Sequence, residues 1–100
     1  MNKAEIVERV VLATEMPRRE ASLAVEAVCD AIIDSLKRGV EVDLRGFATF
    51  KTRKKLPYIR KNPFTGERVN MNARTIPVFI PSQRMKEALN DPKNLRGLEG

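Results

Sequence analysis

The sequence predicts an α+β domain. Two N-terminal helices are followed by a three-stranded antiparallel sheet, from which a long β-ribbon arm protrudes, and a short C-terminal helix ends the fold. Over the first 39 residues, apolar side chains recur every three or four positions, and the period then changes to two. Near residue 51 the alternation loses its apolar side, which predicts a strand that leaves the core and enters solvent.

The first two elements are predicted to be amphipathic helices. The first runs from about residue 3 to 13, and Pro17 suits the start of the second. The second helix carries one broad apolar face and ends at Gly39, a helix stop signal. We expect both apolar faces to form core, because no chemically distinctive residue interrupts them.

The sheet begins at residue 40. A strand of alternating apolar and acidic residues leads through an Arg-Gly turn into a second strand, which carries Phe47 and Phe50. Beyond Phe50 neither face is apolar, so this strand is expected to become one side of an arm spanning about 53–75. Pro57 fits that exposed setting, because a central strand could not spare the missing N–H.

The arm is expected to reverse at its tip, the segment NPFTG at 62–66, and to return as one continuous strand. That strand becomes apolar again around Phe79. Ser82 is placed to cap the short final helix. We assign residues 1–90 to the folded domain and residues 91–100 to a flexible tail.

The core of this domain is small. Without the arm and tail, about 65 residues remain, a length at which a single core is marginal. The chain has one cysteine, Cys29, and no histidine, so one chain can assemble neither a disulfide framework nor a Cys/His zinc site. Phe47, Phe50 and Phe79 flank the arm on strands that need more cover than three short helices provide. We therefore expect a homodimer with these rings in its core, and we expect no metal and no cofactor.

Positive charge is concentrated in the arm. Residues 51–75 hold eight basic residues and one acidic residue, a net charge of +7, whereas the other 75 residues hold 11 basic and 12 acidic residues, a net charge of −1. A partner dense in negative charge is implied, and nucleic acid, an anionic membrane surface and an acidic protein are the candidates.

Other classes of function fit the sequence poorly. Membrane attachment is disfavoured because the charge lies on a ribbon and not on an amphipathic helix, and no apolar run of 18 residues exists. The N-terminus lacks the apolar segment of a secretory signal, so we expect a cytoplasmic protein. Catalysis is disfavoured because the basic segment contains one acidic residue, Glu67, and no histidine, which leaves no pair of carboxylates to hold a metal.

Several segments together resemble the HU/IHF family of bacterial, histone-like, nucleoid-associated DNA-bending proteins. They are MNKAEIVERV at the start, LRGFATF at 44–50, RKNPFTGE at 60–67 and RTIPVFIPSQRMKEAL at 74–89. The resemblance extends without an evident gap to about Asn90. It implies an intertwined dimer whose two arms wrap double-stranded DNA with low sequence specificity. It also implies that the protein is located on the nucleoid and has no small-molecule substrate.

The resemblance also implies roles for individual residues. Minor-groove architectural proteins, of which HU and IHF are known examples, insert apolar side chains between base steps and kink the duplex. Pro63 would be this wedge, and Phe64 would thicken it or lie against the sugars. The arm and minor-groove contacts would come from Arg53, Lys55, Arg60, Lys61, Asn62, Arg68 and Arg74. Phosphates on the flanks would meet Lys3, Arg84 and Lys86.

The sequence departs from the family pattern in ways that leave alternatives open. Arg60 stands where the family usually has glycine, Tyr58 where it has a basic residue, and Ile80 and Gln83 replace two lysines, so contacts on the flanks are expected to be weaker. The chain fits a homodimeric, shape-reading HU, and it also fits a subunit of a sequence-preferring IHF-like protein that pairs with a paralogue. An RNA-binding protein with a basic ribbon remains a rival, because charge alone does not distinguish DNA from RNA.

Overall fold

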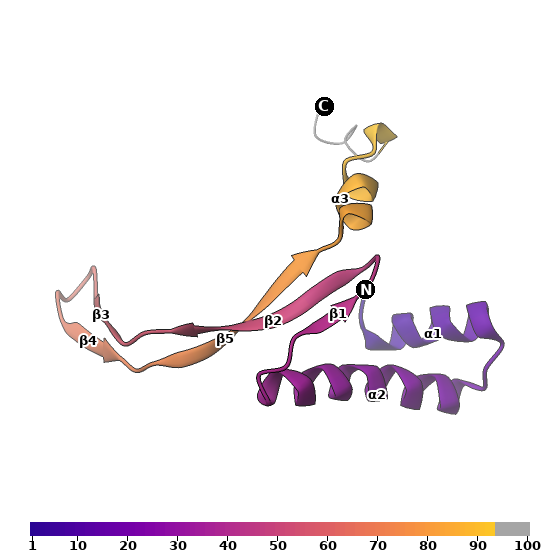
Figure 1. Ribbon diagram of the computed structural model, residues 1–100, viewed down its shortest axis with the longest axis horizontal. Coiled ribbons are helices and arrows are strands. Elements are labelled where there is room, and N and C mark those ends of the chain that lie inside the picture. The colour runs from indigo at the N-terminus through magenta and orange to yellow at the C-terminus, as the bar shows by residue number, and fades with distance from the viewer. Residues whose placement is uncertain (94–100) are drawn as a thin grey trace.

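The computed structural model describes residues 1–93, and most of the tail predicted at 91–100 lies outside the described residues. Figure 1 shows two helices beneath a long sheet that narrows into an arm. The elements are α1 (Lys3–Thr14), α2 (Arg18–Lys37), β1 (Val42–Leu44), β2 (Ala48–Lys55), β3 (Tyr58–Lys61), β4 (Arg68–Met71), β5 (Arg74–Pro81) and α3 (Gln83–Leu89). The predicted α+β class and the order of its parts are confirmed.

The two N-terminal helices pack against each other. The side chain of Asn2 caps α1 by accepting a hydrogen bond from the backbone N–H of Glu5 at 3.0 Å. Val7 of α1 is buried, and an ion pair between Glu8 and Arg18 joins α1 to the start of α2. Both helices are amphipathic, as their sequence periodicity predicts.

The main sheet is antiparallel and has the strand order β1-β2-β5. β2 is therefore central, and Phe50 of β2 pairs directly with Phe79 of β5. The end of β5 is tied to the turn before β2, because Ser82 donates its backbone N–H to Phe47 O at 2.9 Å and its hydroxyl to Gly46 O at 3.0 Å. The same hydroxyl accepts from Met85 N–H at 3.1 Å, so the predicted cap of α3 is confirmed.

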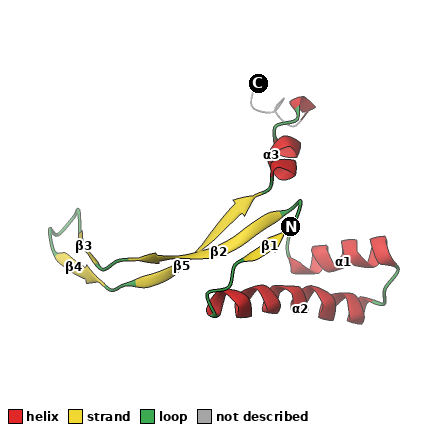
Figure 2. Cartoon of the chain, in the orientation of Figure 1, coloured by secondary structure: helices red, strands yellow, loops and turns green. Residues whose placement is uncertain are grey.

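The arm is made of two ribbon segments in series (Figure 2). β2 and β5 run beyond the helices as the stem, and β3 and β4 form the outer part. Between the two segments, 56–57 on one strand and 72–73 on the other leave the ladder. Two residues are skipped on each side, so the register is the same before and after the break.

The expectation of one continuous return strand is therefore wrong. The return strand is divided at 72–73, where Asn72 is of a residue type depleted in strands. On the opposite strand Pro57 also disfavours pairing at this point, because it has no N–H to donate to a ladder partner. An exposed setting for Pro57 was predicted, and the residue is exposed.

One chain buries little apolar surface. Val7, Ala21 and Ala48 are the fully buried apolar residues of the described chain. The rings of the predicted dimer core form a contiguous row, with centroids 6.4 Å apart for Phe47 and Phe50 and 5.5 Å apart for Phe50 and Phe79. Yet Phe47 and Phe79 are 49% and 51% exposed, so about half of each of these two side chains remains open to solvent. Large apolar residues of α1 and α2 are also exposed, and α3 projects away from these two helices (Figure 1).

This distribution generates a prediction about assembly. Because the exposed phenylalanines and helix faces need a second copy to cover them, the midpoint of thermal unfolding should rise with protein concentration. Calorimetry or circular dichroism over two decades of concentration, combined with sedimentation, measures this. A midpoint that stays constant together with the mass of a single chain would contradict the dimer.

Candidate nucleic-acid interface

The arm tip is a fixed turn that presents apolar side chains outward. The side chain of Asn62 accepts hydrogen bonds from the backbone N–H of Phe64 at 2.8 Å and of Thr65 at 3.4 Å. The backbone of Asn62 also accepts from Gly66 N–H at 2.8 Å, and Gly66 has the φ of +74° that glycine adopts without strain. Asn62 thereby organises the turn from its own side chain. Pro63 and Phe64 are left exposed, with Phe64 95% exposed.

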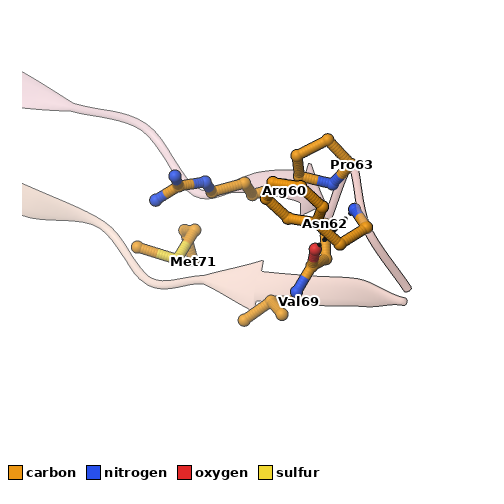
Figure 3. A pocket seen from close by; sticks show the side chains of 6 residues that line it. Arg60, Asn62, Pro63, Val69 and Met71 are labelled. Carbon is orange, nitrogen blue, oxygen red and sulfur yellow. Dashed lines mark hydrogen bonds between the residues drawn. The ribbon is translucent and has the colours of Figure 1, made fainter. Parts of the chain in front are cut away.

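A cavity of about 410 Å³ opens on one face of the tip ribbon (Figure 3). The residues that line it are Arg60, Asn62, Pro63, Phe64, Val69 and Met71. Arg60 and Val69 are cross-strand partners, so their side chains share this face. This face of the tip thus combines apolar side chains with the guanidinium of Arg60 and the amide of Asn62.

The opposite face of the tip carries different chemistry. Lys61 and Arg68 are direct cross-strand partners, one residue along from the pair formed by Arg60 and Val69, and they therefore point to the other face. Two like charges directly opposite each other repel, and the repulsion is relieved when an anion lies between them. Arg60 and Lys61, both predicted to contact the minor groove, therefore lie on the two faces of the tip ribbon.

The stem carries a second group of cations on one face. Arg53 and Lys55 lie on one face of β2, Arg53 exposed and Lys55 half-buried, and Arg74 joins them as the direct partner of Lys55. Lys51 lies on this face by the same alternation, although it was not among the predicted DNA contacts. Lys51, Arg53 and Lys55 are spaced two residues apart in the sequence, so their position on one face of the strand could have been predicted.

Two of the predicted DNA-contacting residues, Lys55 and Lys3, make contacts within the chain that restrict their side chains. The Lys55 ammonium lies 4.6 Å from the centroid of the Tyr58 ring. Lys3 Nζ donates to Glu26 Oε1 at 2.5 Å, which ties the start of α1 to α2. This hydrogen bond, followed by the charge of the same carboxylate, raises the pKa of Lys3 above its usual 10.5. Lys3 would have to exchange Glu26 for a phosphate in order to bind one.

The remaining predicted flank residues lie on α3. Arg84 and Lys86 are both exposed, and α3 lies at the opposite end of the sheet from the arm tip (Figure 1). A single chain therefore does not bring Arg84 and Lys86 together with the wedge residues. Their joint use requires a partner that extends over the whole length of the molecule.

The sequence of residues 1–90 matches the model of the bacterial DNA-binding protein family. The chain belongs to this family. The predicted resemblance to HU and IHF is confirmed, and the family is one of DNA-binding proteins and not of enzymes.

Both branches of the family are represented among the relatives. The chain is 37% identical over 89 residues to DNA-binding protein HU 1 of Bacillus subtilis, an alignment that covers 89% of this chain and 97% of that protein. It is 40% identical over 90 residues to integration host factor subunit alpha of an Anaeromyxobacter species, with 90% and 91% covered.

Solved structures of the family have the same fold. A chain of an Anabaena HU-DNA cocrystal structure superposes with a TM-score of 0.85 at 28% identity, covering 92% of this chain and all of that chain. An HU mutant from Thermotoga maritima superposes with a TM-score of 0.66 at 23% identity, which supports the fold alone.

Two further observations concern the part of the chain that the structure describes. Within residues 1–93, no helix has the length and apolar character needed to cross a membrane. In the same range, His, Cys, Asp and Glu side chains form no cluster of three or more that could hold a metal ion.

The ion pair at Lys3 generates a prediction. Replacing Glu26 by Gln should lower the pKa of Lys3 toward 10.5, because the carboxylate that stabilises the ammonium is removed. A raised pKa in the folded state means that the pair stabilises the fold at neutral pH and that this contribution is lost as the pH rises through the folded-state pKa, above 10.5.

The measurement is an NMR titration of the lysine side chains. Asp30→Asn is the matched control, because Asp30 contributes least among the groups that raise this pKa and should change it less. An unchanged Lys3 titration in Glu26→Gln would show that the pair does not persist in solution.

Proposed function

We propose that this chain forms a dimer that binds double-stranded DNA through the minor groove, with low sequence specificity, and bends it by inserting its arm tips between base steps. The observation that carries the proposal is the exposed apolar pair Pro63 and Phe64 on a fixed turn, at the end of an arm with a net charge of +7. Membership of a bacterial DNA-binding family supports the choice of DNA as the partner.

Pro63 is suited to act as the wedge. Unstacking a base step costs a few kcal/mol, and the gap is stabilised only when an apolar group fills it. Proline is rigid and has no N–H that would lose its hydration on entering the stack. Phe64 stands beside it and extends the apolar surface toward the cavity face.

The cations of the arm would hold the duplex around the wedge. Lys61 and Arg68 on one face of the tip, with Arg60 on the other, can reach the two sugar-phosphate walls of one groove. On the stem, Arg53, Lys55 and Arg74 continue the positive surface toward the body. Each phosphate neutralised releases condensed counterions, which favours binding to any sequence.

The mode of assembly and the cellular place follow from the same proposal. A homodimer, with Phe47, Phe50 and Phe79 in a shared core, would cover the exposed apolar row and supply two arms. A heterodimer with a paralogue is the alternative, supported by the integration host factor subunits among the relatives. We place the protein on the nucleoid in the cytoplasm and assign residues 1–90 to the DNA-binding domain, a division supported by the extent of the family match.

The proposal predicts the salt dependence and the specificity of binding. Affinity for a random duplex should fall steeply with salt, with a slope of about −0.9 per phosphate neutralised, because the arm acts mainly through charge. Preference among sequences should be modest, and duplex RNA should compete poorly, since its minor groove is wide and shallow. Titrations by fluorescence anisotropy measure all of these quantities. A preference above about 10³-fold for one sequence would favour the sequence-preferring branch, and equal competition by RNA would contradict a minor-groove wedge.

A second prediction separates the wedge from the charge. Pro63→Ala should reduce the bend and leave the salt slope unchanged, because alanine is too short to fill the gap and no cation is lost. Lys61→Gln should instead lower the magnitude of the slope by about 0.9. Energy transfer between dyes on the two ends of a duplex of about 35 base pairs, far shorter than the persistence length, reports the bend.

Ile59→Ala is the matched control for Pro63→Ala, because Ile59 is an exposed apolar residue on the other face of the same ribbon. It should leave the bend unchanged. If Pro63→Ala and the double variant with Phe64→Ala both bend DNA as the unmodified protein does, neither residue is the wedge.

A further inference from the structure

The break in the arm separates its tip from its stem. Ladder pairing stops at Lys55 with Arg74 and resumes at Tyr58 with Met71. A hollow of about 290 Å³ opens beside the break and is lined by Lys54, Lys55, Leu56, Ala73, Arg74 and Thr75. No backbone pairing fixes the angle between the two ribbon segments, so side-chain contacts across the break have unusual influence on it.

One polar side-chain contact of the described residues spans the break. The Lys55 ammonium lies 4.6 Å from the centroid of the Tyr58 ring, within the range of a cation–π interaction. Lys55 is half-buried, whereas its neighbour Lys54 is exposed. The two lysines therefore differ in environment, although they are adjacent in the basic segment.

A regular, unbroken ladder would not favour this contact. In a regular strand, residues three apart point to opposite faces, so Lys55 and Tyr58 would lie on different sides of a straight ribbon. The chain leaves the ladder at 56–57, and across this break the Lys55 ammonium reaches the face of the Tyr58 ring. A contact that forms in one arrangement and not in the other shifts the equilibrium toward the arrangement that forms it.

Electrostatics acts in the same direction. Lys55 is the direct cross-strand partner of Arg74, and like charges in that arrangement repel. The electron-rich face of Tyr58 gives the ammonium a favourable alternative on the tip side of the break. Tyr58 therefore links a residue of the stem to the tip segment.

We infer that Tyr58 is a positioning residue, whose ring holds Lys55 and thereby sets the direction of the arm tip relative to its stem. The inference rests on the proposed function, because the direction of the tip decides where Pro63 meets the duplex. An exposed cation–π contact changes such an equilibrium by about two- to fivefold. The arm would remain folded without the ring but would sample other directions.

The first test uses the free protein and does not depend on DNA. In an NMR spectrum the ring current of Tyr58 should move the ε-methylene protons of Lys55 upfield of those of Lys54. Tyr58→Leu should return the Lys55 signals to the Lys54 range, and Tyr58→Phe should keep them upfield, because the ring face is retained. Signals of Lys55 and Lys54 that coincide in the unmodified protein would overturn the inference.

The second test measures the consequence for DNA. Tyr58→Leu should reduce the energy transfer across a bent duplex without changing the salt slope, and Tyr58→Phe should restore it. Lys55→Gln and Lys54→Gln form a matched pair: each should lower the salt slope by about one contact, and only Lys55→Gln should also reduce the bend.

The outcomes separate this inference from the proposed function. Full bending by Tyr58→Leu, or equal loss of bending in Tyr58→Phe and Tyr58→Leu, would overturn a positioning role for the ring. Equal bending by the two lysine variants would do the same. If the unmodified protein fails to bend DNA, the proposed function fails, while the spectra of the free protein still decide whether Tyr58 holds Lys55.

Discussion

The shortage of core in a single chain is the constraint on which the rest of the structure depends. Three apolar residues, Val7, Ala21 and Ala48, are buried, while Phe47 and Phe79 in the row of phenylalanines beside the arm are about half exposed. Burial of apolar surface is the main favourable term in folding, so a chain with this distribution has a strong thermodynamic reason to associate. Association through the open row also gives the molecule two arms, which is what a DNA-bending protein of the proposed kind requires.

The arm is built without a core of its own. Its stability comes from backbone pairing and from the hydrogen bonds of Asn62 at the tip. It also contains two like-charged cross-strand pairs, Lys55 with Arg74 and Lys61 with Arg68, which work against folding of the free arm. Local interactions that destabilise the fold, such as these, are expected at functional sites. Phosphates beside the arm would turn this repulsion into attraction, so the electrostatic strain of the free arm favours binding.

Much of the fold could be predicted because it is encoded by local patterns. The change of hydrophobic period from about 3.6 to two gave the order of helices and strands, and Ser82 was recognised as a helix cap from its type and place. The division of the return strand at 72–73 places Asn72 on that strand opposite Pro57 across the ladder, and this juxtaposition depends on the pairing register. Features that depend on pairing register become visible only when both strands are placed.

The site shows the same limit. The exposed apolar tip and the basic arm were predicted from the sequence, and the wedge role of Pro63 and Phe64 remains a prediction. Adjacency in sequence suggested that Arg60 and Lys61 act together, whereas alternation along the strand places them on opposite faces. The partner of Lys3 could not be anticipated, because Glu26 lies 23 positions away on another helix. The contact between Lys55 and Tyr58 depends on a local break that no periodicity encodes.

The central claim is that the DNA-bending unit is a pair of chains acting on one duplex. The most direct test is a titration at concentrations well above the dissociation constant, in which protein is added to an end-labelled duplex of about 35 base pairs and energy transfer is recorded. Energy transfer should rise linearly and reach its plateau at two chains per duplex. A plateau at one chain per duplex, or binding that leaves the energy transfer unchanged, would contradict the account.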